Sequence, residues 1–265
     1  MTGPSLIAAG LGFRLGEDAT LGAEAAIRGA DRVFHIVGDP ATEAWIAGLN
    51  PRSETLRLPG GEGETPRPEK YAQMMAPVRA ALQAGERVCV ATCGHPGVLS
   101  DPSHAAAILA RDMGAEARVL PGIGAEGRMF ADLGLDPGET GWQAWDATDF
   151  LIHGRRPDPT AALILFQPAM VGSHRYRVYD ARGLSLLTER LADLHGEAHE
   201  VVVYEAAYDD GAPAIRRRAL SALSPADLTA DSLLFVPPSQ APRPDLKMMA
   251  RLARIDADAQ AETPE

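Results

Sequence analysis

Arg67 and Tyr71 are the residues of this sequence whose types and spacing most directly suggest chemistry. Residues four apart share one face of a helix, so these two are expected to lie side by side. An arginine cation can stabilise an oxyanion, and the same cation favours tyrosinate, the form of tyrosine that accepts a proton. Taken alone, the pair is also typical of a surface contact on a helix. The surrounding sequence has to decide between a catalytic pair and a surface contact.

Glycine-containing segments follow several expected strands. The first is residues 10–16, whose G-x-G-x-x-x-G spacing misses the dinucleotide-binding fingerprint by one residue, and Asp39 is only a weak candidate for a ribose ligand. The others are residues 93–98 (Cys-Gly-His-Pro-Gly-Val) and 121–126 (Pro-Gly-Ile-Gly-Ala-Glu). Open α/β sheets place ligands at such strand ends, and glycine lets a backbone approach a ligand closely. Tight turns without a ligand remain the alternative for each segment.

Short apolar runs alternate with helical patterns, as expected for βαβ units and a mostly parallel sheet. Strands are expected at residues 5–9, 32–37, 87–92, 117–120, 161–166, 200–204 and 232–236, with a hairpin near 215–219. Helices are expected at residues 20–28, 41–48, 69–84, 104–114, 126–133 and 185–194, and a loop at 51–68. We therefore predict an α/β fold with an N-terminal domain over residues 1–120 and a C-terminal domain over residues 121–253.

The end of the sequence gives two expectations. Met248, Met249 and Leu252 suggest a helix that docks onto a partner or onto the chain's own core. Residues 254–265 are small and mostly acidic, so we expect this tail to be disordered.

Composition and charge exclude several classes of function. The 265 residues carry a formal net charge of −11, which argues against a nucleic-acid partner because a phosphate backbone attracts a basic surface. Cys89 and Cys93 fit neither a disulfide framework nor a zinc site, so reduced thiols, no metal and a cytoplasmic location are expected. Neither a signal peptide nor an apolar run of the ~20 residues that span a membrane is recognisable.

A resemblance to a known family rests on several of these segments together. Residues 94–98 followed by residues 120–125 are similar to the paired signature of the tetrapyrrole methylase superfamily, as is the opening at residues 8–12 with Ala-Asp-Arg-Val at 30–33. The match runs in order over residues 5–240. Within that superfamily, three blocks resemble the borosin-type peptide backbone N-methyltransferases: residues 38–44, 130–137 and 147–152.

The resemblance implies a two-domain tetrapyrrole methylase-like fold with S-adenosylmethionine in a cleft between the domains and S-adenosylhomocysteine as the product. In such enzymes the cofactor is held largely by backbone groups of the loops that follow the strands. This cofactor has no phosphate, so the imperfect glycine spacing is no objection. By position, the resemblance implies cofactor contacts at Gly10, Cys93, His95, Pro96, Val98, Ser100, Gly124, Ala125, Gln167, Val236 and Pro237.

The resemblance also implies a catalytic role for Arg67 and Tyr71, because borosin-type enzymes carry an Arg-x-x-x-Tyr pair at the matching place. Methylating an amide nitrogen requires that its proton be removed and that the resulting imidate oxygen be stabilised. Tyr71 is then the general base and Arg67 holds the oxyanion. The chain departs from the family pattern at Leu58, Gly61 and Cys93, where tyrosines are usual; Cys93 is otherwise typical of a small buried strand residue.

We therefore predict N-methylation of backbone amides in a separate ribosomal precursor peptide, because the tail lacks an apolar run that resembles a fused peptide. The resemblance implies an intertwined homodimer, which could hold two peptides in a 2:2 complex. One alternative is methylation of a tetrapyrrole or another small molecule, against which the blocks at residues 130–137 and 147–152 argue. The other, favoured by the missing tyrosines, is a non-catalytic protein that binds cofactor and peptide.

Overall fold

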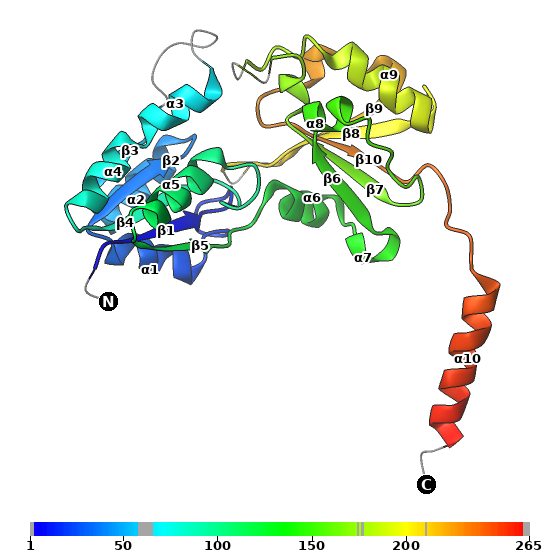
Figure 1. Cartoon of the computed structure of the whole chain (residues 1–265). Coiled ribbons are helices and arrows are strands. Elements are labelled where there is room, and N and C mark those ends of the chain that lie inside the picture. Colours follow the sequence, from blue (N-terminus) through cyan, green and yellow to red (C-terminus); the bar gives the residue numbers. More distant parts are fainter. Residues whose placement is uncertain (1–2, 58–65, 174, 176–177, 210, 262–265) are drawn as a thin grey trace.

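The chain folds into two α/β lobes in a computed structural model that describes residues 3–57, 66–173, 175, 178–209 and 211–261. Figure 1 shows the lobes side by side, each built around its own five-stranded sheet. The two-domain α/β prediction is confirmed at the level of the fold. The first lobe ends with the strand that finishes at Leu120, and the second begins with the helix that starts at Ala125.

The first sheet is parallel throughout and has the strand order β3-β2-β4-β1-β5. Its strands are β1 (Ser5–Gly10), β2 (Arg32–Ile36), β3 (Ser53–Thr55), β4 (Arg87–Thr92) and β5 (Glu116–Leu120). Its helices are α1 (Leu21–Gly29), α2 (Pro40–Leu49), α3 (Arg67–Met74), α4 (Ala76–Gln83) and α5 (Asp101–Asp112). Because β1 lies between β4 and β5, the loop that follows it lies between the loops that follow these two strands at the sheet's carboxyl edge.

Alternation along β4 explains why helices cover both faces of this sheet. Val88 and Val90 pack in a core cluster with α3, α4 and α5, whereas Cys89 and Ala91 pack with α1 and α2. A strand that is buried on both faces is expected to be continuously apolar, as β4 is. Thr20 caps α1 as predicted, since its hydroxyl accepts a 3.1 Å hydrogen bond from the backbone of the first turn.

The second sheet is mixed and has the order β6-β7-β10-β8-β9. Its strands are β6 (Trp142–Asp146), β7 (Ala162–Phe166), β8 (Glu200–Glu205), β9 (Ala214–Ala219) and β10 (Leu233–Val236). Among the adjacent strands of this sheet, β6 and β7 form the single parallel pair, and β10 runs antiparallel to both of its neighbours. β8 and β9 form an antiparallel pair, as the hairpin predicted for this region requires. The helices of this lobe are α6 (Ala125–Leu133), α7 (Pro137–Thr140), α8 (Ala147–Ile152) and α9 (Leu184–His195).

Two strands were not expected from the sequence. β3 lies within the segment 51–68, which we predicted to be a loop, and β6 lies in a segment for which we predicted no strand. The three residues of β3 are polar and pair only with β2 at the sheet edge, so they show no apolar pattern. β6 is also an edge strand, and none of its residues is fully buried. A strand without a buried face shows no regular alternation of apolar and polar residues in the sequence.

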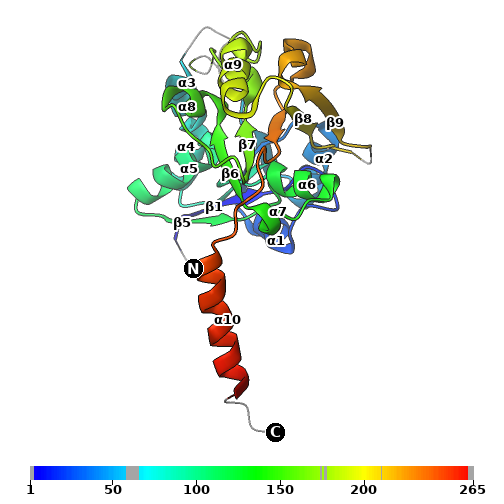
Figure 2. The ribbon, with the colours of Figure 1, turned by 90° about the vertical axis from the view of Figure 1, so that its right-hand side faces the viewer.

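The helix predicted over residues 69–84 is divided into α3 and α4, because Pro77 occupies the first turn of α4 and cannot continue a helix. The expected disorder of residues 254–265 is wrong as far as residue 261, since α10 (Leu246–Ala261) continues through an alanine-rich stretch free of glycine and proline. In both ribbon views α10 stands away from the lobes (Figures 1 and 2). Met248, Met249 and Leu252 are exposed, so this helix does not dock onto the chain's own core.

Candidate active site

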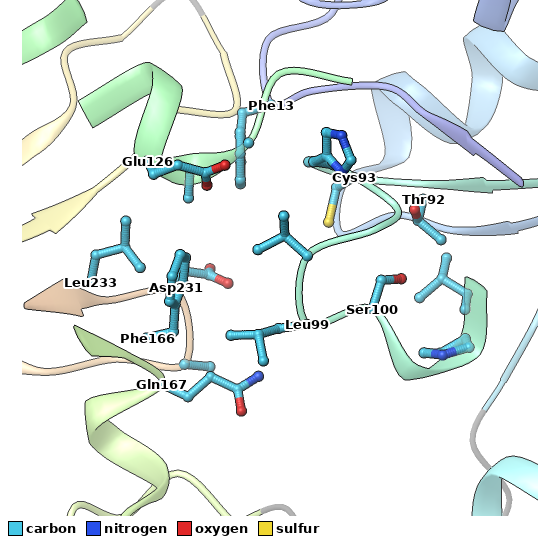
Figure 3. A pocket seen from close by; sticks show the side chains of 18 of the residues that line it. Phe13, Thr92, Cys93, Leu99, Ser100, Glu126, Phe166, Gln167, Asp231 and Leu233 are labelled. Atoms are coloured by element: carbon cyan, nitrogen blue, oxygen red, sulfur yellow. The ribbon is translucent and has the colours of Figure 1, made fainter. Parts of the chain in front are cut away.

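A cavity of about 430 Å³ lies between the two lobes. The first lobe contributes the loop after β4 and part of α3, and the second contributes the start of α6 and residues at one end of β7 and β10. Figure 3 shows the labelled side chains of both lobes around one open space. Ligands of open α/β sheets bind at the carboxyl ends of parallel strands, and the first lobe meets the cavity with that edge of its sheet.

Three glycine-containing loops pack closely against one another beside this cavity. A Cβ atom on Gly10 would lie 2.5 Å from the carbonyl oxygen of Gly94 and 2.9 Å from the Cα atom of Gly122. Gly94 also has a φ of +66°, and its backbone exchanges hydrogen bonds with Gly12. The glycine signals of the sequence therefore reflect loops that touch one another, so that the chain can turn at three neighbouring strand ends.

The loop after β4 is held by hydrogen bonds of its own. His95 accepts a 2.9 Å hydrogen bond at Nδ1 from the backbone of Gly97, and the Ser100 hydroxyl lies 2.8 Å from the hydroxyl of Ser103. Leu99 and Gln167, whose side chains lie near each other in Figure 3, both line the cavity and both have positive φ (48° and 55°). Non-glycine residues in this conformation are uncommon and concentrate at functional sites.

Two acidic residues of the second lobe also line the cavity: Glu126 in α6 and Asp231 before β10. Burial raises the pKa of Asp231, and the nearby carboxylate of Glu205 raises it further, while a hydrogen bond with Tyr208 opposes the shift. Burial also raises the pKa of Tyr208, whose ring packs edge-on against Phe13 at 5.7 Å between ring centres.

Sequence reasoning did not find Phe13, Glu126, Tyr208 or Asp231. Glu126 follows the predicted Gly124 and Ala125 directly, so its place could have been inferred from theirs. The other three carry no motif, and tertiary folding alone brings them to the cavity.

Most of the residues predicted at the site do line this cavity. They are Tyr71, Cys93, His95, Val98, Ser100, Gly124, Ala125 and Gln167. Gly10 and Pro96 are in contact range of each other in the adjacent loops but are not lining residues. Arg67 begins α3 four residues before Tyr71, and its side chain lies outside the described part of the structure. Leu58 and Gly61 also lie outside the described residues.

Val236 and Pro237 are not brought to the cavity. The resemblance implies that the carboxyl end of this last strand faces the cofactor, but β10 is antiparallel to β7 and pairs Leu233 with Phe166. The amino end of β10 therefore lies at the cavity, where Ala230 to Leu233 line it. Pro237 lies at the opposite end, beside a second cavity of about 360 Å³.

An ionic bridge links the two lobes near the cavity. Asp18, which is 2% exposed, accepts hydrogen bonds from the backbones of Phe13 and Arg14 in the loop after β1. Its other oxygen lies 3.1 Å from Nη1 of Arg128 in α6. Arg128 also lies 3.6 Å from Asp132, which accepts a 2.6 Å hydrogen bond from the hydroxyl of Tyr204. The bridge thus joins the loop that carries Phe13 to the helix that carries Glu126.

Replacing Arg128 with alanine is expected to lower the free energy of unfolding by about 3 kcal/mol, because it leaves the buried Asp18 carboxylate without its cation. The same change should weaken ligand binding, since Phe13 lines the cavity. Denaturant unfolding measures the first effect. Lysine at this position keeps the charge and is the control, and an alanine variant as stable as the parent would show that the bridge contributes nothing.

Comparison with known proteins identifies the family. Residues 5–211 match the family model described as Tetrapyrrole (Corrin/Porphyrin) Methylases. The chain belongs to this family. Among its solved relatives by shape, a uroporphyrin-III-C-methyltransferase from Thermus thermophilus has a TM-score of 0.61 and 21% identity, covering 92% of this chain and 99% of that one. The methyltransferase CobJ has a TM-score of 0.63 and 18% identity, with coverage of 91% and 97%. Both matches show similarity of the fold alone.

Several curated relatives with higher identity carry a borosin name, as the resemblance predicted. A methyltransferase/type III borosin cyclic peptide precursor of Anomoporia bombycina is 40% identical over 190 residues, 71% of this chain and 22% of that protein. A type I borosin counterpart of Serendipita vermifera subsp. bescii is 35% identical over 94% of this chain and 62% of that protein. The omphalotin A precursor of Omphalotus olearius is 37% identical, with coverage of 77% and 49%. The chain thus spans less than two thirds of each of these relatives.

None of the helices in the described part of the chain is long and apolar enough to cross a membrane. Within the same residues, no group of three or more His, Cys, Asp and Glu side chains is arranged to hold a metal ion.

Proposed function

We propose that this protein transfers methyl groups from S-adenosylmethionine to backbone amide nitrogens of a ribosomal precursor peptide. The observation that carries the proposal is Tyr71, which lines an inter-lobe cavity of a tetrapyrrole methylase family member. The names of relatives that are 35–40% identical, each of which includes a methyltransferase and a ribosomally synthesized cyclic peptide precursor, support a peptide as the substrate.

The chemistry of the cavity fits this cofactor. Apolar side chains such as Val98, Leu99 and Phe166 offer a surface for a purine ring, and the polar groups of Ser100 and Gln167 can bind its ribose and amino-acid parts. Neither lysine nor arginine lines the cavity in the described part of the chain, as suits a cofactor without phosphate. When bound, the cofactor supplies an electrophilic methyl group on a sulfonium sulfur, which keeps the bonding electrons as the methyl leaves.

Tyr71 has the position and chemistry of the general base. It is half-buried, packs against the core cluster under α3, and reaches the cavity beside the loop after β4. It would take the proton of the peptide amide, so that the nitrogen lone pair is free to form the new bond to carbon. Arg67, one helical turn earlier, would hold the negative charge that develops on the amide oxygen. Binding in one cavity would hold both partners close together in the orientation that the transfer needs.

The peptide is proposed to reach the cavity as a separate chain. Mass spectrometry after incubation with cofactor and a candidate peptide tests the proposal. Methyl gains on a peptide support it, whereas gains on a tetrapyrrole alone, or binding without any gain, would replace it with one of the two alternatives.

Thiol labelling tests where the cofactor binds. Cys93 lines the cavity and is partly exposed, whereas Cys89 is fully buried, and burial raises the pKa of its thiol to about 12. An alkylating reagent at neutral pH is therefore expected to modify Cys93 and to leave Cys89 intact, because only accessible thiolate reacts. Saturating S-adenosylhomocysteine should slow the labelling of Cys93 at least about tenfold, as judged by peptide mass spectrometry. Labelling at an unchanged rate would place the cofactor elsewhere.

We propose further that the protein acts as a homodimer, which could hold two peptides in a 2:2 complex. The exposed apolar side chains of α10, among them Leu246 at 74% and Ile255 at 62% exposure, support an interaction beyond the chain itself. Sedimentation equilibrium with and without residues 246–261 measures the oligomeric state. A monomer at micromolar concentration would contradict the proposal.

A further inference from the structure

Charged side chains lie unevenly around the cavity. Glu126 and Asp231 both come from the second lobe and extend toward the open space in Figure 3. Among the described residues that line the cavity, none is a lysine or an arginine, and His95 is the single histidine. Among the described residues, the cavity wall therefore carries two carboxylates and neither a lysine nor an arginine.

The Glu126 carboxylate lies at the cavity wall, beside Gly124. Its Oε2 atom is buried and has no hydrogen-bond partner in the structure. The carboxylate folds back over the start of α6, where a Cβ atom on Gly124 would lie 2.4 Å from both of its oxygens, so glycine leaves the space that this carboxylate occupies. Buried acceptors are normally paired, and a donor or a cation from a ligand would satisfy this one.

Asp231 lines the same space. Its hydrogen-bond partner is the neutral phenol of Tyr208, and burial raises its pKa. A carboxylate removed from water in this way gains more from a neighbouring positive charge than an exposed one does.

We propose that Glu126 and Asp231 make the cavity select the positively charged sulfonium cofactor over its neutral thioether product. This inference rests on the proposed function, since it concerns the same cavity and the same cofactor. The two compounds share the nucleoside and the amino-acid groups and differ in the methyl group and the charge on sulfur. Two carboxylates attract that charge, and the attraction disappears once the methyl group has been transferred. The pair would therefore favour loading of the cofactor and release of the product.

Calorimetric titration of the full chain with three probes tests this inference. The variants are Glu126→Gln, Asp231→Asn and their combination, which keep size and hydrogen bonding but remove charge. In the double variant, affinity for S-adenosylmethionine is expected to fall about tenfold, while affinity for S-adenosylhomocysteine changes less than about twofold. Sinefungin, which carries an ammonium group in place of the sulfonium, should follow S-adenosylmethionine.

The control is Glu139→Gln, an exposed glutamate beside the second cavity, which removes one negative charge without touching the first. Retained affinity for S-adenosylhomocysteine shows that the double variant still folds its cavity. If the variant loses affinity for both compounds equally, or for neither, the inference is overturned although the proposed function stands. A parent protein that binds neither compound would overturn both.

Discussion

Replacing Tyr71 with phenylalanine is expected to reduce methyl transfer at least about 100-fold while leaving cofactor affinity within about twofold of the parent. The change removes only the hydroxyl that would accept the amide proton. The ring still packs against the first-lobe core, so the fold should be retained. Single-turnover rates followed by mass spectrometry, with calorimetry for the cofactor, measure the two quantities separately.

Tyr208→Phe is the matched control, because Tyr208 lines the same cavity and loses the same hydroxyl. Burial and the neighbouring Asp231 raise the pKa of Tyr208, so it is a poor source of tyrosinate, and its loss should reduce the rate much less. An active Tyr71→Phe variant beside an inactive Tyr208→Phe variant would move the base assignment from the first residue to the second.

Replacing Gly122 with alanine should destabilise the protein by about 3 kcal/mol and lower its melting temperature by roughly 5–10 °C. A Cβ atom there would lie 2.6 Å from the carbonyl oxygen of Gly94 and 2.8 Å from the backbone of Gly10, distances that real Cβ contacts do not reach. Three loops would have to separate. Because these loops adjoin the cavity, cofactor affinity should fall as well. Thermal unfolding followed by circular dichroism gives the measurement.

Gly48→Ala provides the comparison for this variant. Gly48 lies inside α2 with open space around it, so alanine there is expected to be neutral or slightly stabilising. Equal melting temperatures for the two variants would mean that the close approach of the three loops does not restrict residue 122.

Local sequence signals predicted the first lobe well, because its central strands are buried runs flanked by glycine turns. β1 and β4 are examples, and the cap at Thr20 marked the start of α1. The strand β6 escaped prediction because its stability comes from pairing with β7 and not from an apolar period of its own. Neighbours distant in the sequence supply that pairing, and no local pattern encodes it.

Strand direction explains what the sequence could and could not predict about the site. Residues on loops after parallel strands, such as Cys93 and Ser100, line the cavity because the carboxyl edge of a parallel sheet is a shared edge. Val236 and Pro237 lie away from the cavity because the direction of β10 depends on its partners and not on its own residues. Asp231 lies just before that strand, and the same reversal of direction brings it to the cavity.

The most direct test of the account is tandem mass spectrometry of a precursor peptide after incubation with this protein and S-adenosylmethionine that carries a deuterated methyl group. We predict that the label appears on backbone amide nitrogens of the peptide and that the Tyr71→Phe variant leaves the peptide unlabelled. Label confined to side chains, or equal backbone labelling by the parent and the Tyr71→Phe variant, would contradict the account.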